Sequence, residues 1–192
     1  MTITIVPATA DRFDDVEHTF SGGGDGLSCQ CQWWTLTNAQ FEASDRDERE
    51  RMLRAQVAAE PSPALIAYVD EEAAGWVRVG PRPTQPRLSR TRNFAATTEP
   101  WDDPSVWAVS CFVVRKEHRG RGLNRKLLDA AIDHARTNGA RVLEAYPTET
   151  DTDTAKRRSN DLYIGILSVF ESAGFREIAR PKPERVIVQL KL

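Results

Sequence analysis

The sequence has no apolar run approaching the ~20 residues needed to cross a bilayer, so a membrane-spanning protein is not expected. Its first residues, Met1–Val6, lack the basic start and long apolar core of a signal peptide. Cysteine is scarce and odd in number. The three cysteines argue against a disulfide framework and favour free thiols in a reducing compartment. Together these absences predict a cytoplasmic protein.

Neither sign of charge is in strong excess. The net charge is −2, and acidic and basic residues are mixed along the chain. The basic surface typical of nucleic-acid-binding proteins is therefore missing, and neither a nucleic-acid nor a membrane partner is expected. Apolar residues make up 40% of the 192 residues, enough for one good core. We expect a single domain over residues 1–192.

Two common phosphate-binding motifs are also absent. A P-loop needs G-x-x-x-x-G-K-[ST], which does not occur in the chain. A dinucleotide-binding fingerprint needs G-x-G-x-x-G, but Gly120 and Gly122 are followed by Arg125 where the third glycine belongs. Nucleotide binding of either kind is not predicted.

The chain does contain another combination that favours an anion. An apolar run, Val106–Val114, precedes the basic loop Arg119–Asn124, and a helical pattern then continues to about Thr137. Free amides at a helix start and the helix dipole attract negative charge, and glycines let a phosphate approach the backbone. Positive charge around the loop comes from Arg119, Arg121 and Arg125.

This arrangement resembles the signature of the GNAT acetyltransferase superfamily, R/Q-x-x-G-x-G/A after an apolar strand. The motif reads Arg119-x-x-Gly122-x-Asn124, in which Asn124 departs from the usual Gly or Ala but keeps its amide. The resemblance implies acetyl-CoA as co-substrate, with its pyrophosphate on the loop amides and its pantetheine arm along the strand. The coenzyme-binding residues implied are Phe112, Val113, Val114, Arg119, Gly120, Arg121, Gly122, Leu123, Asn124 and Arg125.

The remaining patterns predict the element order β-α-α-β-β-β-α-β-α-β-β, an α/β fold with a mixed sheet. The GNAT fold has this order, with a mostly antiparallel sheet flanked by helices. Ala64–Val69 and Ala73–Val79 are expected to form a β-hairpin, and Ser44 is expected to cap a charged helix. The long Pro- and Arg-rich connection over residues 80–104 is expected to be functional or mobile.

In the second half of the chain, the strand Val142–Tyr146 is followed by a polar loop containing Thr148–Ser159. A helix carrying Leu162, Ile166, Val169 and Ala173 is expected to follow and to stop at Gly174. In the family the motif strand separates from its neighbour at a bulge, which we expect near Ser110.

Neither a general acid nor a general base is evident. Phe170 stands where many relatives carry a tyrosine that protonates the leaving thiolate. Tyr163, two turns earlier on the same expected helix, is an alternative acid, although such a tyrosine more often belongs to the core. Glu144 within its apolar strand is a candidate base, but a structural ion pair is the preferred interpretation. His118 is expected to be solvated.

Cys29-x-Cys31 does not predict a metal site, because no second Cys/His pair completes four ligands. Trp33 and Trp34 follow the flexible loop Ser21–Gly26, in the region where the family forms its acceptor-substrate wall. They are interpreted either as the wall or lid of a substrate pocket, or as a plug in the core.

The sequence thus predicts an acyl-CoA-dependent N-acyltransferase, most simply an N-acetyltransferase acting on a small-molecule or peptide amine by direct attack. A non-catalytic acyl-CoA sensor or partner-binding module on the same fold is the alternative, because a clear acid and a clear base are both missing. Family members are often dimers, so a homodimer is a possible assembly.

Overall fold

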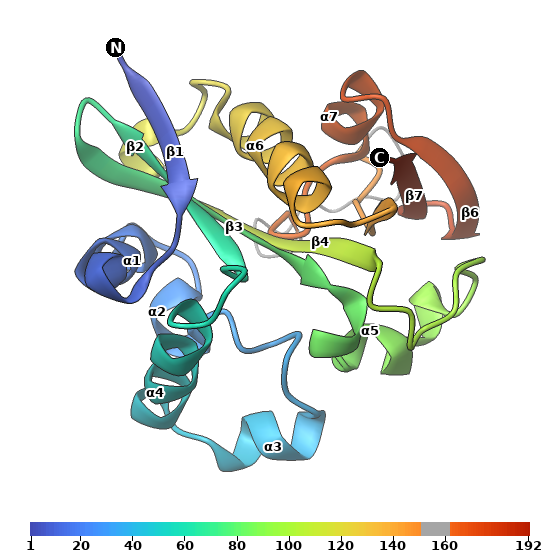
Figure 1. The fold of residues 1–192 in the computed structure, drawn as a ribbon, viewed down its shortest axis with the longest axis horizontal. Coiled ribbons are helices and arrows are strands. Elements are labelled where there is room, and N and C mark those ends of the chain that lie inside the picture. Colours follow the sequence, from blue (N-terminus) through green and yellow to red (C-terminus); the bar gives the residue numbers. More distant parts are fainter. Residues whose placement is uncertain (151–161) are drawn as a thin grey trace.

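The computed structural model describes residues 1–150 and 162–192 of the chain. Seven strands form one sheet in the order β1-β2-β3-β4-β5-β7-β6 (Figure 1). Neighbours are antiparallel except β4 and β5, which are parallel, so the predicted mixed, mostly antiparallel sheet is confirmed. The strands are β1 (Ile3–Pro7), β2 (Ala64–Val69), β3 (Glu72–Pro81), β4 (Val106–Val114), β5 (Val142–Ala145), β6 (Arg176–Lys182) and β7 (Arg185–Lys191).

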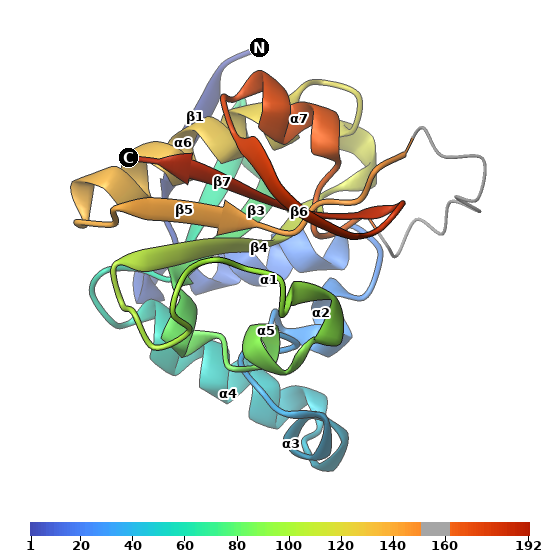
Figure 2. The ribbon, with the colours of Figure 1, turned by 90° about the vertical axis from the view of Figure 1, so that its right-hand side faces the viewer.

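Helices cover both faces of this sheet, as Figure 2 shows. On one face lie α6 (Leu123–Thr137) and α7 (Leu167–Ser172), and on the other lie α1 (Phe13–Ser21) and α4 (Arg46–Val57). The shorter helices are α2 (Gly26–Cys29), α3 (Asn38–Ala43) and α5 (Arg87–Arg90). Single 3₁₀ turns are η1 (Ala10–Arg12), η2 (Arg82–Thr84), η3 (Arg92–Phe94) and η4 (Lys116–His118). None of the helices in the described ranges combines the length and apolar character of a membrane span.

Helix α6 forms where its sequence pattern predicts it. Leu127, Leu128 and Ala131 are fully buried against the sheet, which accounts for the apolar stripe. Gly122 caps its start with a left-handed φ of 74°, and Gly139 follows its end with a φ of 80°. Both positions favour glycine, because a side chain strains a left-handed backbone.

The predicted hairpin of β2 and β3 is present. Asp70 and Glu71 form its two-residue turn with φ values of 47° and 73°, the left-handed pair that a tight hairpin requires. The capping prediction was one residue early: Asp45 rather than Ser44 caps α4, in a capping box with Glu48.

Strand β4 has two irregularities that open the sheet beside it. Arg78 pairs with Cys111 while Val79 pairs with Val109, so Ser110 is an extra, bulged residue as expected. Beyond the bulge β4 runs on to Val114, although its pairing with β5 ends at Val109. Within the sheet, the second half of β4 is therefore paired with β3 but not with β5.

The helix predicted from Leu162 to Gly174 was wrong in its first half. Helix α7 starts only at Leu167, because Ile166 is extended (φ −108°, ψ 143°) and Gly165 has a left-handed φ of 84°. Tyr163 lies in the segment before the helix. Most of the predicted polar loop Thr148–Ser159 lies outside the described residues.

Candidate active site

In the second half of β4, every second backbone amide faces away from β3. The Arg115 amide donates to Ala74 across the β3–β4 pair at 3.0 Å, so in antiparallel alternation the Phe112 and Val114 amides face the opposite side. The Phe112 amide donates to the Tyr163 carbonyl at 2.6 Å. The segment around Tyr163 thus lies beside β4, on the side that β5 leaves open.

The glycine loop follows β4 and leads into α6. Gly120 and Gly122 have left-handed φ values of 76° and 74°, and a Cβ at either would meet no described protein atom within 4 Å. Gly122 supplies no side-chain cap, so the first-turn amides of α6 are available to a ligand. Arg119 ties the loop to the strand, since its Nε donates to the Val114 carbonyl at 3.2 Å. Open space, free amides and guanidinium groups meet the requirements of a phosphate site.

These elements border one cavity of about 780 Å³, here called the β4 cavity. Val113, Val114, Arg119 and Asn124 line it, so strand and loop face the same space. The Oδ1 atom of Asn124 is buried and has no hydrogen-bond partner in the described part of the chain. Asn124, the departure from the family motif, therefore places an unsatisfied acceptor beside the loop.

The side chains of Leu123 and Arg125 make contacts within the protein that the sequence did not suggest. The Leu123 side chain is 2% exposed in the core, so only its backbone faces the loop. Arg125 donates to Asp129 and Ser172, both at 2.8 Å, and so joins α6 to α7. Arg121 is exposed.

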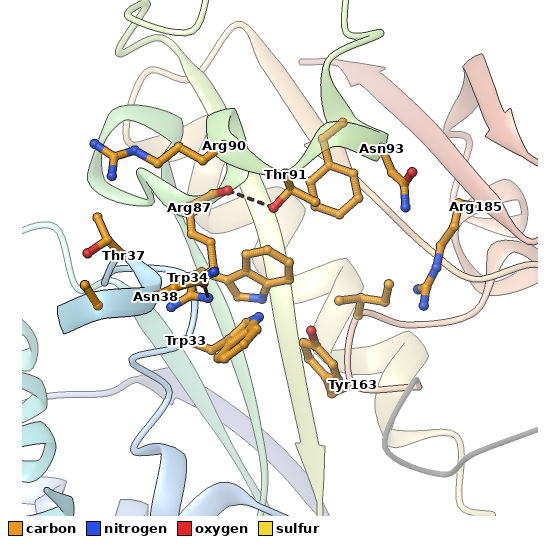
Figure 3. Close-up of a pocket in the computed structure, with 13 residues that line it drawn as sticks. Trp33, Trp34, Thr37, Asn38, Arg87, Arg90, Thr91, Asn93, Tyr163 and Arg185 are labelled. Atoms are coloured by element: carbon orange, nitrogen blue, oxygen red, sulfur yellow. Dashed lines mark hydrogen bonds between the residues drawn. The ribbon is translucent and has the colours of Figure 1, made fainter. Parts of the chain in front are cut away.

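A second cavity of about 620 Å³, here called the arginine cavity, lies beyond the β4 cavity. Trp33, Trp34 and Tyr163 line both spaces, and these three side chains are here called the partition. Figure 3 shows them next to one another at the arginine cavity. The Trp34 and Tyr163 ring centres are 6.2 Å apart, and Trp34 Nε1 donates to the Ser110 carbonyl at 2.8 Å. The β4 bulge thereby holds the partition in place.

The sequence left open whether Trp33 and Trp34 form a pocket wall or a plug in the core, and the two side chains differ in burial. Trp34 is 5% exposed and packs in an apolar cluster with Phe94, whereas Trp33 is 38% exposed. The Arg87 guanidinium covers one face of the Trp33 ring at 3.8 Å. Trp34 is both core and cavity wall, and Trp33 is wall.

The loop after α1 lies along the β4 cavity. Gly23, Gly24 and Gly26 line that cavity together with the partition residues. None of these glycines lines the arginine cavity in the described structure. The loop therefore lies on the same side as the end of β4 and the start of α6.

Tyr163 and Phe170 were expected on one helix face, but only Phe170 lies in α7, and Tyr163 precedes the helix. Phe170 is fully buried and packs edge-to-face with Phe112 and Phe175, at centroid distances of 6.1 and 5.2 Å. Tyr163 instead stands half-buried in the partition. An acidic hydroxyl at the cavity can come from Tyr163 but not from the position of Phe170.

Glu144 is fully buried on β5 and lines neither cavity. Its Oε1 accepts from Arg82 at 2.9 Å and from Tyr146 at 2.5 Å, and its Oε2 accepts from Thr97 at 2.6 Å and Gln189 at 2.7 Å. Burial and the charge of Glu144 raise the pKa of Tyr146 well above its usual value, so this hydroxyl stays a donor. All four donors converge on one carboxylate.

Arg82, paired with Glu144, also bonds to other parts of the connection over residues 80–104. Its guanidinium also donates to the carbonyls of Glu99, at 2.9 Å, and Pro100, and it lies 4.4 Å from the centre of the Trp101 ring. The connection is thus fastened to β5 through buried charge, and it supplies α5 and η3 to the arginine cavity.

His118 is buried rather than solvated, which corrects the expectation from the sequence. It is 6% exposed, and its Nε2 lies 3.2 Å from Oε2 of Glu72 in the hairpin. The turn η4 folds it inward against a residue 46 positions away. Local sequence gave no sign of this partner.

The three cysteines are free and all line the β4 cavity. Burial raises the pKa of Cys31, but the hydrogen bond with Cys111 and the charge of Arg78 outweigh it and lower the pKa to about 7. The same hydrogen bond, then burial, raises the pKa of Cys111 well above its usual value, and burial raises that of Cys29 to about 11. No cluster in the described ranges has three His, Cys, Asp or Glu side chains placed to hold a metal ion.

The sequence missed the arginines of the second cavity. Arg87, Arg90 and Arg185 line it, and they come from α5 and from the start of β7. The Arg-rich composition of residues 80–104 was the only available signal, and it did not indicate which arginines meet. Their proximity depends on the tertiary fold.

A bulged strand that leaves its parallel neighbour, followed by a glycine loop and a helix, defines the class of acyl-CoA N-acyltransferase folds. Residues 31–163 match the model of the Acetyltransferase (GNAT) family. The chain therefore belongs to the GNAT acetyltransferase family. No curated protein sequence matches it.

Solved structures with low sequence identity share the fold. The yncA protein of Salmonella typhimurium, determined with its cofactor acetyl-CoA, is 19% identical with a TM-score of 0.57 over 100% of this chain and 95% of its own. The paiA N-acetyltransferase of Thermoplasma acidophilum, in complex with coenzyme A, is 12% identical with a TM-score of 0.55 over 100% of both chains. A ribosomal-protein-alanine N-acetyltransferase of Brucella melitensis is 18% identical, with a TM-score of 0.56 over 98% of this chain and 99% of its own.

Proposed function

We propose that the protein transfers an acetyl group from acetyl-CoA to the nitrogen of an amine acceptor. The observation that carries this proposal is that the end of β4, beyond its pairing with β5, and the glycine loop before α6 border a single cavity. Family membership and neighbours determined with acetyl-CoA or coenzyme A support the same co-substrate.

The loop would hold the pyrophosphate. Its first-turn amides have no side-chain cap, the space above Gly120 and Gly122 is open, and Arg119 adds charge. The Val114 amide and the Asn124 Oδ1 would bond the amide groups of the pantetheine arm, which is supported by Val114 and Asn124 lining the cavity and by the unpartnered Oδ1. An extended ligand would thus add to β4 as a further strand.

The reacting carbonyl would lie near Phe112, next to the partition. The backbone amides on this edge of β4 would stabilise negative charge on its oxygen as the amine attacks. Tyr163, which lines the cavity, would give a proton to the departing thiolate or orient the coenzyme. A thiolate leaves readily near neutral pH, so positioning and amine deprotonation supply most of the rate.

Glu144 would serve a structural role in this scheme. It accepts four hydrogen bonds away from both cavities, which leaves no lone pair directed at an amine. Three free thiols fit a reducing compartment, so we also propose that the enzyme works in the cytoplasm.

One observation favours the alternative, a non-catalytic acyl-CoA sensor. Asp25 is the only carboxylate among the described residues that line the β4 cavity, and no histidine lines it. Incubation with acetyl-CoA and a panel of amines separates the two functions. Acetylated product should be detected by mass spectrometry, because the free cysteines would react with a thiol reagent. Tight acetyl-CoA binding without product from any amine would support the sensor.

A further inference from the structure

Three arginines line the arginine cavity. Arg87, Arg90 and Arg185 line it, and none of the described residues on its wall is an aspartate or glutamate. Its other polar groups are threonine hydroxyls, asparagine amides and the Tyr163 hydroxyl (Figure 3). The whole protein has a net charge of −2, so this local excess of cations marks a site that favours an anion.

Arg87 is the most buried of the three arginines, at 5% exposed. Its Nε donates to the Leu36 carbonyl at 2.8 Å, and its Nη1 donates to Oδ1 of Asn38. In the described ranges no carboxylate forms an ion pair with it, and its Nη2 has no hydrogen-bond partner. Burial lowers the pKa of Arg87, and the nearby Tyr163, Cys29 and Glu42 oppose this shift only in part. A buried guanidinium without an ion-pair partner is costly, and an anionic ligand would reduce that cost.

Arg90 and Arg185 reach the cavity from two other positions in the fold. Arg90 ends α5, is exposed, and forms no hydrogen bond or ion pair with any described residue. Arg185 begins β7, and its Nη1 donates to Thr148 at 3.0 Å. In Figure 3 it enters the cavity from the side opposite Arg87. Cationic groups thus lie on several walls of one space.

The partition places this charge next to the proposed reaction. Trp33, Trp34 and Tyr163 line both cavities, so the arginine cavity adjoins the space beside the end of β4. A volume of about 620 Å³ suits a small molecule rather than a folded partner.

We propose that the acceptor is a small amine that also carries a carboxylate or phosphate, bound by Arg87, Arg90 and Arg185. This inference rests on the N-acetyltransferase function proposed above. The anion lies among the arginines and the amine points toward the partition. The same cations disfavour an ammonium ion nearby and favour the neutral amine that attacks. The ammonium proton would pass to water before the attack, and water would also take the proton that the nitrogen loses as the amide forms. Polyamines fit poorly, because their charges are repelled.

Matched acceptors test this directly. Amino acids are compared with their carboxamides, and O-phosphoethanolamine with ethanolamine. Because removing the anion also changes the pKa of the amine, the rates in each pair are compared at equal concentrations of neutral amine. We expect kcat/KM to be at least tenfold higher for the anionic member of the pairs that react. The two series also distinguish a carboxylate from a phosphate as the recognised group.

A variant then assigns the preference to the cavity. Arg90→Glu is chosen over a change of buried Arg87, because an exposed side chain can change without unfolding the protein. It should lower kcat/KM for anionic acceptors at least tenfold while acetyl-CoA affinity stays unchanged. Arg51→Glu is the matched control: Arg51 is exposed on α4, lines neither cavity, and changes the net charge equally.

Equal or faster turnover of the neutral acceptors would overturn the inference and leave the N-acetyltransferase function intact. Calorimetry on protein saturated with coenzyme A provides a second measurement, in which the anionic members should bind and the neutral members should not. If no anionic member binds or reacts, the inference is wrong. Acetyl-CoA binding in the same series reports separately on the proposed function, which its absence would refute.

Discussion

Replacing Glu144 with glutamine tests whether this carboxylate is structural. Glutamine keeps the shape but not the charge, so Arg82 would be buried without its counter-ion. Its amide nitrogen would also face two of the four donors that now bond the carboxylate. Hydrogen bonds to charged groups contribute ~1.5–3 kcal/mol each, and breaking a buried ion pair costs ~3–5 kcal/mol. We expect a loss of ~3–5 kcal/mol from a total stability of ~5–15 kcal/mol.

Urea unfolding followed by tryptophan fluorescence measures this loss. Glu177→Gln is the control, because Glu177 pairs with Arg180 at 2.6 Å but on the surface, where such pairs contribute ~0–1 kcal/mol. The folded Glu144→Gln protein should bind acetyl-CoA with parental affinity. A stability change below ~1 kcal/mol together with lost turnover would refute the reasoning and make Glu144 a catalytic candidate again.

Three further predictions concern the cavities. Gly122→Val should weaken acetyl-CoA binding at least tenfold, or ~1.4 kcal/mol, by filling the open space at the loop; in calorimetry, Gly139→Val, with an equally left-handed and open position, should not. Tyr163→Phe should lower turnover ~100-fold if the hydroxyl donates a proton, and turnover within twofold of the parent would leave Tyr163 a wall residue. Trp34→Ala should cost ~3–5 kcal/mol of stability in thermal unfolding, whereas Trp33→Ala should melt near the parent and raise the acceptor KM; similar melting of both variants would contradict this division.

The elements predicted best are those with patterns that are continuous in sequence. Strand β4 and helix α6 were predicted within about a residue, because an unbroken apolar run and a 3.6-residue stripe each decide one element locally. The helix expected from Leu162 failed, although its apolar spacing was correct. Gly165 has a left-handed φ of 84° and Ile166 is extended, so the helical backbone does not continue before Leu167. A Cβ at Gly165 would lie 2.6 Å from the Phe170 ring, which favours glycine there.

The candidate site was predictable only where it is local. The glycine loop follows from one stretch of sequence, whereas the bulge at Ser110 was expected from the resemblance to the family. The buried pair of Arg82 and Glu144 joins residues 62 positions apart, and the arginine cavity combines segments from several parts of the chain. Such contacts depend on the tertiary fold, which residue spacing does not specify.

The Phe112 amide already donates a hydrogen bond to the Tyr163 carbonyl, so a ligand on this edge of β4 can bind this amide only by replacing that bond. A carbonyl that takes this amide must first displace Tyr163, so one backbone bond replaces another of similar strength. The usual net contribution of ~1 kcal/mol per bond would then be cancelled at this position. Coenzyme affinity would come chiefly from the phosphate loop, and the amide would become more useful as negative charge develops on the bound oxygen, since a charged acceptor outcompetes a neutral carbonyl. The segment around Tyr163 would thereby weaken binding of the ground state more than binding of the transition state.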